Sequence, residues 1–336
     1  MSGACTAAAA AGPQTTLARV RAARVLRCGI DVEEAEFTTA DDHGNRQTFD
    51  ADLCRAVAAA VLGKNAHIAV RQFPDDRAGM QALTRGEVDM IATLTDDFTH
   101  SAGTHLQFTR PVLWDGVGFL VLAASPVSRA DQLGGKKICL LAETSVEESV
   151  RAWFARRRLN FVPFPFQEEG EMEAAFATGN CGALAGDRTR LAETRAALRK
   201  NRENARLLSA TIAKDPLAAA TRDDDPQWTE IVNWVMEALV EAEESGVTQA
   251  NVKRMQALAA EPAGAHPTLR FLLGGSHQIG SALQLDNNWV VRVIEATGNY
   301  GEIYERDLGA HSIAKLPRGE NNLRENGGLM IALPAK

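Results

Sequence analysis

The sequence predicts an α/β protein built from two similar lobes. Segments with the alternating apolar spacing of strands are followed by segments with the 3.6-residue spacing of helices, and this order is typical of parallel α/β sheets. The order begins again after a β-rich run at 116–122. The 336 residues suffice for about two domains, and 45% hydrophobic residues suffice for a sizeable core.

The first half of the chain alternates helix and strand. Leu17, Val20 and Ala23 share one face of a first helix, and Gly86 ends a later one. The residues at 41–45 are rich in Asp, Gly and Asn, which predicts a turn. The predicted helices span 16–27, 52–62 and 77–85, and the predicted strands span 25–30, 67–73 and 88–92.

The second half repeats this layout and then becomes helical. The predicted strands span 137–141, 161–166, 182–185 and 205–208, and the predicted helices span 130–133, 145–158, 169–178 and 187–199. The clearest helix spans 227–245, because its apolar residues form one stripe and Gly246 follows as a stop. Further helices are expected at 249–259 and 289–297.

Composition and motif spacing exclude several classes of function. A net charge of -7 gives no basic surface for nucleic acid, and no run of eighteen apolar residues predicts a membrane span. No cysteines have CxxC spacing, and His100 and His105 lack the spacing of metal ligands. We therefore expect neither a metal nor a cofactor, and no catalytic Ser-His-Asp or Cys-His set.

The first fifteen residues predict a disordered, alanine-rich leader. They lack the charged and bulky apolar segments of a signal peptide. The alternative is a lipid anchor, since Ser2-Gly3-Ala4-Cys5 resembles the end of a bacterial lipoprotein cleavage site.

Four further cysteines are either reduced core residues or two disulfides. Three pairings are open, and the neighbourhoods favour Cys28–Cys54 and Cys139–Cys181, each within one half of the chain. Such bridges would place the protein outside the cytosol.

Several motifs together resemble the general L-amino-acid-binding branch of the bacterial solute-binding proteins of family 3. The N-terminal motifs are CGI at 28–30 and FDADLCRAVAAA at 49–60. Further motifs, found across nearly the whole chain, are RGEVDM (85–90), DGVGFLV (115–121), DPQWTEIVNW (225–234), EAEESGVTQANV (241–252), QLDNNW (284–289), GNYGEIYER (298–306) and GGLM (327–330).

The resemblance implies a bilobal fold of the periplasmic-binding-protein type II, with a ligand cleft between the lobes. Lobe one would comprise 16–118 and 219–336, lobe two 123–213, and the hinges about 119–122 and 214–218. It also implies a periplasmic or extracytoplasmic monomer that delivers a small amino compound to the membrane permease subunits of an ABC importer. The branch has cysteines like the two pairs above.

An amino-acid ligand needs an acceptor for its ammonium group and donors for its carboxylate. Asp187 stands where the family places its ammonium-binding aspartate, although a carboxylate there also fits a helix cap. Thr144 and Ser145 match the helix start that offers N–H groups to a carboxylate, or else form a plain N-cap.

The carboxylate-clamping arginine of the family is missing. It should fall at His100 or Ser101, yet no arginine lies between Arg85 and Arg110. Serine lacks the charge, and histidine has a reference pKa near 6.5 and carries only a partial charge at neutral pH. Arg77 and Arg110 are the candidates to compensate, and both also fit solvated surface positions.

Acidic residues surround the same region. Thr95 and Asp96 end an apolar run and form part of the expected lobe-one wall, followed by Asp97. Glu34 and Phe37 belong to an acidic loop expected at the cleft mouth, where relatives carry a stacking aromatic. An anionic cleft would attract a cation and repel a free carboxylate, although charge runs are usually solvated.

These observations favour a non-catalytic binding protein for an ABC importer, with a non-standard or cationic amino ligand. One alternative is a sensor or scaffold that kept the fold and lost transport. Another is a derived dehydratase-like enzyme, against which the missing arginine counts.

Overall fold

The structure is a computed structural model that describes residues 15–31, 39–40, 46–200, 204–261, 267–274 and 279–334. The predictions made for residues 1–14 with Cys5, and those for Glu34 and Phe37, lie outside the described residues.

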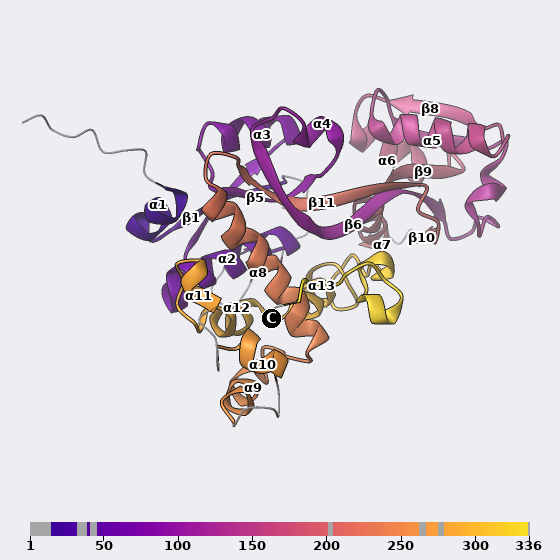
Figure 1. The fold of residues 1–336 in the computed structure, drawn as a ribbon. Coiled ribbons are helices and arrows are strands. Elements are labelled where there is room, and N and C mark those ends of the chain that lie inside the picture. Colours follow the sequence, from indigo (N-terminus) through magenta and orange to yellow (C-terminus); the bar gives the residue numbers. More distant parts are fainter. Residues whose placement is uncertain are drawn as a thin grey trace, which may run out of the picture.

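One twisted sheet runs through both lobes (Figure 1). Its strand order is β4-β1-β5-β11-β6-β9-β7-β8, and β10 pairs with β6. The strands are β1 (Leu26–Asp31), β4 (Ile68–Phe73), β5 (Met90–Thr95), β6 (Leu106–Leu122), β7 (Lys137–Leu141), β8 (Val162–Phe166), β9 (Ala183–Asp187), β10 (Ala205–Leu207) and β11 (Ala213–Arg222). The parallel pairs of each lobe are joined by the antiparallel strands β6 and β11.

Lobe one covers its part of the sheet on both faces. The larger core packs α2, α8 and α12 around buried residues such as Leu53, Trp228 and Ile294, and a smaller core lies under α3 around Leu83. The helices are α1 (Thr16–Ala23), α2 (Phe49–Leu62), α3 (Asp76–Thr84), α4 (Phe98–Ser101), α8 (Pro226–Glu244), α9 (Val252–Ala259), α10 (Pro267–Leu272), α11 (Ile279–Ala282), α12 (Trp289–Thr297) and α13 (Tyr300–Asp307).

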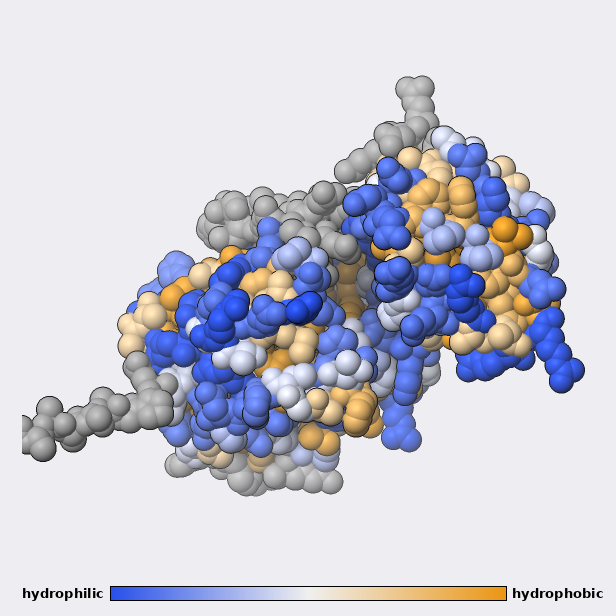
Figure 2. All heavy atoms as spheres, turned by 90° about the horizontal axis from the view of Figure 1, so that it is seen from above, coloured by the Kyte–Doolittle hydropathy of each residue, from blue (hydrophilic) through white to orange (hydrophobic). Residues whose placement is uncertain are grey.

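Lobe two has the same layered build. Helix α5 (Ser145–Arg156) buries Trp153 and Phe154 against one face of the sheet. Helices α6 (Glu169–Ala177) and α7 (Arg188–Lys200) cover the other face around Phe176 and Leu191. Each lobe therefore has its own core, and the hinge strands join them. The space-filling view shows a hollow between the two masses (Figure 2).

The remaining elements are short. They comprise the antiparallel pair of β2 (Thr39–Ala40) and β3 (Arg46–Gln47) and the 3₁₀ turns η2 (Gly63–Asn65), η3 (Ala130–Leu133), η4 (Gly319–Asn321) and η5 (Arg324–Asn326).

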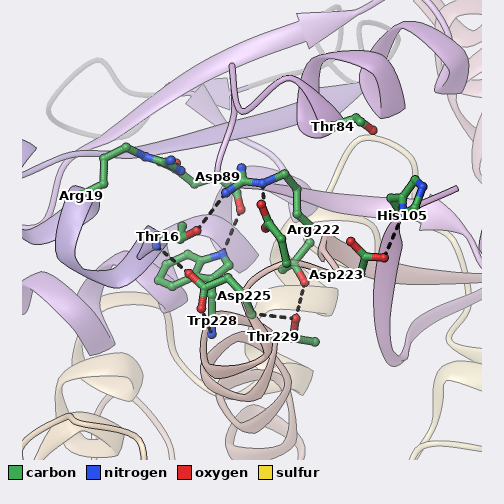
Figure 3. A network of polar contacts seen from close by, with 12 residues as sticks. Thr16, Arg19, Thr84, Asp89, His105, Arg222, Asp223, Asp225, Trp228 and Thr229 are labelled. Carbon is green, nitrogen blue, oxygen red and sulfur yellow. Dashed lines mark hydrogen bonds and ion pairs between the residues drawn. The ribbon is translucent and has the colours of Figure 1, made fainter. Parts of the chain in front are cut away.

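A polar network ties the first helix to the start of α8 (Figure 3). The Asp225 carboxylate accepts the N–H of Trp228 at 3.1 Å, which caps α8, and the N–H of Thr16 at 2.6 Å. The Trp228 indole donates to the Asp89 carbonyl at 2.9 Å, and the Asp89 carboxylate pairs with Arg19. Because the buried carboxylates of Asp225 and Asp89 each have donors from lobe one, they hold the end of hinge strand β11 against this lobe just before α8 begins.

Two disulfides lie in the cores. Cys28 of β1 bonds to Cys54 of α2, and Cys139 of β7 bonds to Cys181 before β9. These are the pairs that the neighbourhoods and the resemblance favour, and each cross-links a strand to an adjoining segment of its own lobe.

The segment after α13 contacts both the hinge strand β6 and helix α7 of lobe two. The Asn321 side chain accepts the Trp114 N–H at 2.6 Å and donates to the Trp114 carbonyl at 2.9 Å. Earlier in this segment, the Ala314 carbonyl accepts a hydrogen bond of 2.6 Å from Arg195 of lobe two. One lobe-one segment thus contacts both the hinge and lobe two.

Several elements differ from those predicted. Helix α1 ends at Ala23, because Arg24 adopts a left-handed conformation with φ 56°, so it does not overlap β1. Strand β6 begins ten residues before the predicted β-rich run at 116, because its polar first half pairs with β11. Helix α13 was not predicted, although Asn299 and Glu302 form a capping box that the sequence displays.

Candidate functional site

The two hinge strands approach each other at a glycine. Gly116 has φ +152°, and a Cβ atom there would lie 2.0 Å from the Ala213 carbonyl oxygen of β11. Only glycine permits this spacing, so the sequence DGVG at 115–118 brings β6 and β11 together. The residues beside Gly116 therefore lie where the two hinge strands approach each other closely.

Three carboxylates, which we call the hinge carboxylates, share one face of the sheet here. Asp115 of β6 lies opposite Asp215 of β11. Val117 lies opposite Ala213 on one side and Asp187 of β9 on the other. Directly opposed antiparallel residues, and residues two apart on one strand, point to the same face. The register therefore gathers Asp115, Asp187 and Asp215 on one face.

Asp115 has a structural role. Its carboxylate is 4% exposed and accepts the N–H groups of Arg188 and Thr189, each at 3.2 Å, and the Thr189 hydroxyl. Burial raises its pKa, and these hydrogen bonds oppose the rise. Asp115 thus holds the start of α7 against the hinge.

Asp187 is the last residue of β9 and lies half-buried directly before α7. This position puts its side chain at the junction of lobe two and the hinge. Its role as the acceptor for a ligand ammonium group stays a prediction.

Thr144 acts as the N-cap of α5. Its hydroxyl accepts the Glu147 N–H at 3.3 Å and donates to the Leu141 carbonyl at 3.0 Å. Ser145 is the exposed first residue of the helix. The capping interpretation of Thr144 is therefore present in the structure, and carboxylate binding at this helix start stays a prediction.

The lobe-one wall is Thr95 with Asp96, Asp97 and α4. Thr95 gives a side-chain hydrogen bond to Asp215, and the Asp96 N–H donates to the Pro216 carbonyl at 2.8 Å. Burial, and next the charge of Asp97, raise the pKa of Asp96. The expected wall is thus fastened to hinge strand β11.

His100 and Ser101, where the arginine would fall, contact Asp97. The His100 Nδ1 atom lies 2.8 Å from the Asp97 carboxylate, and its Nε2 atom lies 3.8 Å from that of Asp76. The Ser101 hydroxyl donates to the Asp97 carbonyl at 2.6 Å. His100 therefore lies between two carboxylates of its own lobe.

The two arginines considered as substitutes lie in different places. Arg77 is exposed on α3 and lines an open surface groove of about 350 Å³ with His100. Arg110 lies 3.3 Å from Glu237 of α8 and donates to the Ile331 carbonyl at 3.3 Å. Arg110 therefore has partners on α8 and in the C-terminal segment, and its compensation for the missing arginine stays a prediction.

Sequence reasoning missed Asp215. Burial, opposed by the Thr95 hydrogen bond and supported by the charges of Asp115, Asp76 and Asp97, raises the pKa of Asp215 to about 6. Its neighbours come from three separate segments, so no local motif points to it. The available signal was its place inside the predicted hinge at 214–218.

No group of three or more His, Cys, Asp or Glu residues in the described ranges is arranged to hold a metal ion. Within the same ranges, no helix has the length and apolar character needed to cross a bilayer.

Comparisons with known proteins agree with the bilobal geometry. A sequence model of the bacterial extracellular solute-binding proteins, family 3, matches residues 26–254. The general L-amino acid-binding periplasmic protein AapJ of Rhizobium johnstonii is 36% identical, over 98% of this chain and 95% of its own. The glutamate/glutamine/aspartate/asparagine-binding protein BztA of Rhodobacter capsulatus is 35% identical, over 97% and 95%.

A solved structure extends the match to three dimensions. It is an ABC transporter periplasmic binding protein from Brucella ovis with glutathione bound, and it is 33% identical with a TM-score of 0.82. The match covers 96% of this chain and all of that one. The resemblance inferred from the motifs is confirmed, and the chain belongs to the bacterial extracellular solute-binding proteins of family 3.

Proposed function

We propose that this solute-binding protein is a non-catalytic, monomeric, extracytoplasmic receptor that delivers a small amino compound to the permease subunits of an ABC importer. The family assignment and the names of the relatives support this role, since they are periplasmic binding proteins for amino acids or, in one solved structure, glutathione. The two-lobed fold supports closure around a ligand by hinge motion.

The ligand we propose has its carboxylate modified or absent, as in an amide, an amine or another cationic amino compound. One observation supports this proposal: the strand register puts the hinge carboxylates on one face of the sheet, while no arginine occurs between Arg85 and Arg110. An anionic site with low-dielectric walls attracts cations and repels anions. Asp187 would accept the ligand ammonium group, and His100, where the family's arginine would fall, lies between the carboxylates of Asp76 and Asp97.

A calorimetric panel tests this ligand class. The probes are L-glutamine, L-glutamate, glutathione, agmatine, putrescine and L-glutaminamide, each titrated into the purified chain. We expect cationic or amidated probes to bind at least tenfold more tightly than L-glutamate, and Asp187→Asn to weaken them at least tenfold. The matched control is Asp131→Asn, since Asp131 is an exposed carboxylate of lobe two that pairs with Arg129.

Tight binding of L-glutamate or glutathione, with weak binding of the amines, would contradict the altered ligand and leave an ordinary amino-acid or peptide receptor. A flat panel would contradict the receptor role itself. Turnover of any probe, followed by mass spectrometry, would contradict the non-catalytic role.

A further inference from the structure

The segment that follows α13 contacts lobe two away from the hinge strands. We call residues 308–323 the C-terminal strap, and it belongs to the yellow part of the chain near α7 (Figure 1). Arg195 of α7 donates hydrogen bonds to two consecutive strap carbonyls, that of Ala314 at 2.6 Å and that of Lys315 at 3.1 Å. A lobe-two side chain thus holds the strap backbone at two neighbouring points.

An apolar contact accompanies these hydrogen bonds. Leu316 and Ala314 of the strap are 5% and 6% exposed, and they pack with the fully buried Ala192 of α7. The half-buried Leu207 of β10 packs against the same cluster. This cluster is separate from the core of either lobe, so its apolar surface is removed from water only while the strap lies on lobe two.

The strap is also fastened to lobe one, directly after its contact with lobe two. The Tyr304 hydroxyl of α13 donates to the Pro317 carbonyl at 3.3 Å. Arg318 lies 2.5 Å from Glu243 of α8, and both side chains are largely buried. Because these anchors come so soon after Leu316, the contact with α7 cannot follow lobe two far without breaking them.

The backbone between the two sets of contacts adopts an uncommon conformation. Lys315 has φ 47°, in the left-handed region that residues other than glycine rarely occupy. Such conformations persist where surrounding contacts hold them. Here the hydrogen bonds of Arg195 on one side and the anchor at Pro317 on the other do so.

We propose that the C-terminal strap is a third connection between the lobes, a noncovalent one that stabilises the lobe arrangement of this structure against rotation about the hinge. The hinge strands β6 and β11 are the covalent connections. The proposal concerns the equilibrium between lobe arrangements and not the ligand, so its failure would leave the proposed function standing.

The position of the contact along α7 makes it sensitive to rotation. Helix α7 begins at Arg188 beside the hinge, so Arg195 lies roughly 10 Å along its axis at a rise of about 1.5 Å per residue. A rotation of about 15–20° would move this point by up to roughly 3 Å. An N–H···O distance stays within about 2.7–3.2 Å, so the bonds to the strap would break.

Electron paramagnetic resonance measures the interlobe distance without any ligand. The spin labels are attached through Gln81→Cys on α3 and Ala152→Cys on α5, two exposed positions, in a Cys5→Ser background. We expect a narrow distance distribution when the strap is intact. Arg195→Ala combined with Leu316→Ala should widen this distribution about twofold or more, because the lobes then populate further arrangements.

Two control variants separate the strap contact from a general effect of substitution. Arg129→Ala removes an exposed arginine of lobe two that pairs with Asp131, and it should leave the distribution unchanged. Lys315→Gly keeps both strap carbonyls and tolerates the left-handed φ, so it too should keep the distribution narrow.

Hydrogen exchange shows whether the double variant has released the strap. Amides of the strap should exchange about tenfold faster or more, whereas those of α2 and α5 in the two cores should exchange as before. Arg195→Ala alone, which leaves the apolar contact, should give an intermediate width. A released strap with an equally narrow distance distribution would overturn the proposal, and so would equal widening by Arg129→Ala.

Discussion

Replacing Asp307 with asparagine should change how the stability of lobe one depends on pH. Asp307 of α13 has a side chain that is 1% exposed, next to Asp52 of α2. Burial, then the Asp52 charge and a hydrogen bond with Asp52, raise the pKa of Asp307 to about 8. Asp52 itself pairs with Arg55 and Arg306. Asp307 is therefore a neutral acid at pH 7 that shares its proton with an ionised partner.

The direction in which the free energy of unfolding changes with pH follows from proton linkage. Between the unfolded pKa of 3.8 and the folded pKa of about 8, the folded chain binds one proton more at Asp307 than the unfolded chain. The stabilisation present below pH 3.8 is therefore lost as pH rises through this range, by at most about 1.4 kcal/mol per pH unit. Between pH 5 and pH 7 the loss amounts to about 3 kcal/mol.

Urea unfolding at pH 5, 6 and 7, followed by tryptophan fluorescence and circular dichroism, measures this effect. The asparagine amide can still donate to Asp52 and does not titrate, so the stability of Asp307→Asn relative to the unaltered protein should rise with pH. Asp131→Asn is the control, because Asp131 has a lowered pKa and is ionised in both states throughout this range. Parallel stability curves for Asp307→Asn and the unaltered protein would refute the shared-proton assignment.

Three further outcomes are expected. Ser101→Arg, placing a planar fork where the family carries one, should tighten L-glutamate binding at least tenfold in calorimetry, whereas Ser101→Lys should gain less; no gain would show that the clamp position lies elsewhere. Gly116→Ala should lower the unfolding free energy by about 2–4 kcal/mol, whereas Gly170→Ala, where a Cβ meets nothing within 4 Å, should be neutral or stabilising; equal effects in denaturant titrations would contradict the close strand approach. Removing the Cys139–Cys181 bridge, which closes 42 residues, by a double alanine variant should cost about 4 kcal/mol in the chain-entropy account, and an unchanged urea midpoint would contradict it.

The regular α/β units were predictable because their signals are local. An apolar strand and the helix after it each carry their own spacing, as in β7 and α5, and the structure contains both close to the predicted bounds. The hinge strands were harder. Their residues include Pro111, Asp115, Lys214 and Pro216, which do not alternate cleanly, and they form strands because they pair with each other across about 100 residues of intervening chain.

In the candidate site, too, the residues with local partners were predictable, and those with distant partners were not. Thr144 was predictable as a helix cap, because capping depends on residues within one turn. The ion-pair partner of Arg110 was not predictable, because Glu237 lies far along the chain on α8. Asp215 is the extreme case, since its character depends on Thr95, Asp115 and Asp76, which three separate elements supply.

The negative charge that we propose for the cleft therefore depends more on the register of β6 with β9 and β11, which gathers the hinge carboxylates, than on the missing arginine. At the position of the missing arginine, Arg77 is exposed on the neighbouring α3, and His100 lies between two carboxylates of its own lobe. Restoring an arginine would add a donor for a ligand carboxylate, yet it would leave the hinge carboxylates together on one face of the sheet. A single substitution at Ser101 should consequently broaden the ligand range toward ordinary amino acids without abolishing binding of cations, and only loss of a hinge carboxylate should remove the cation preference.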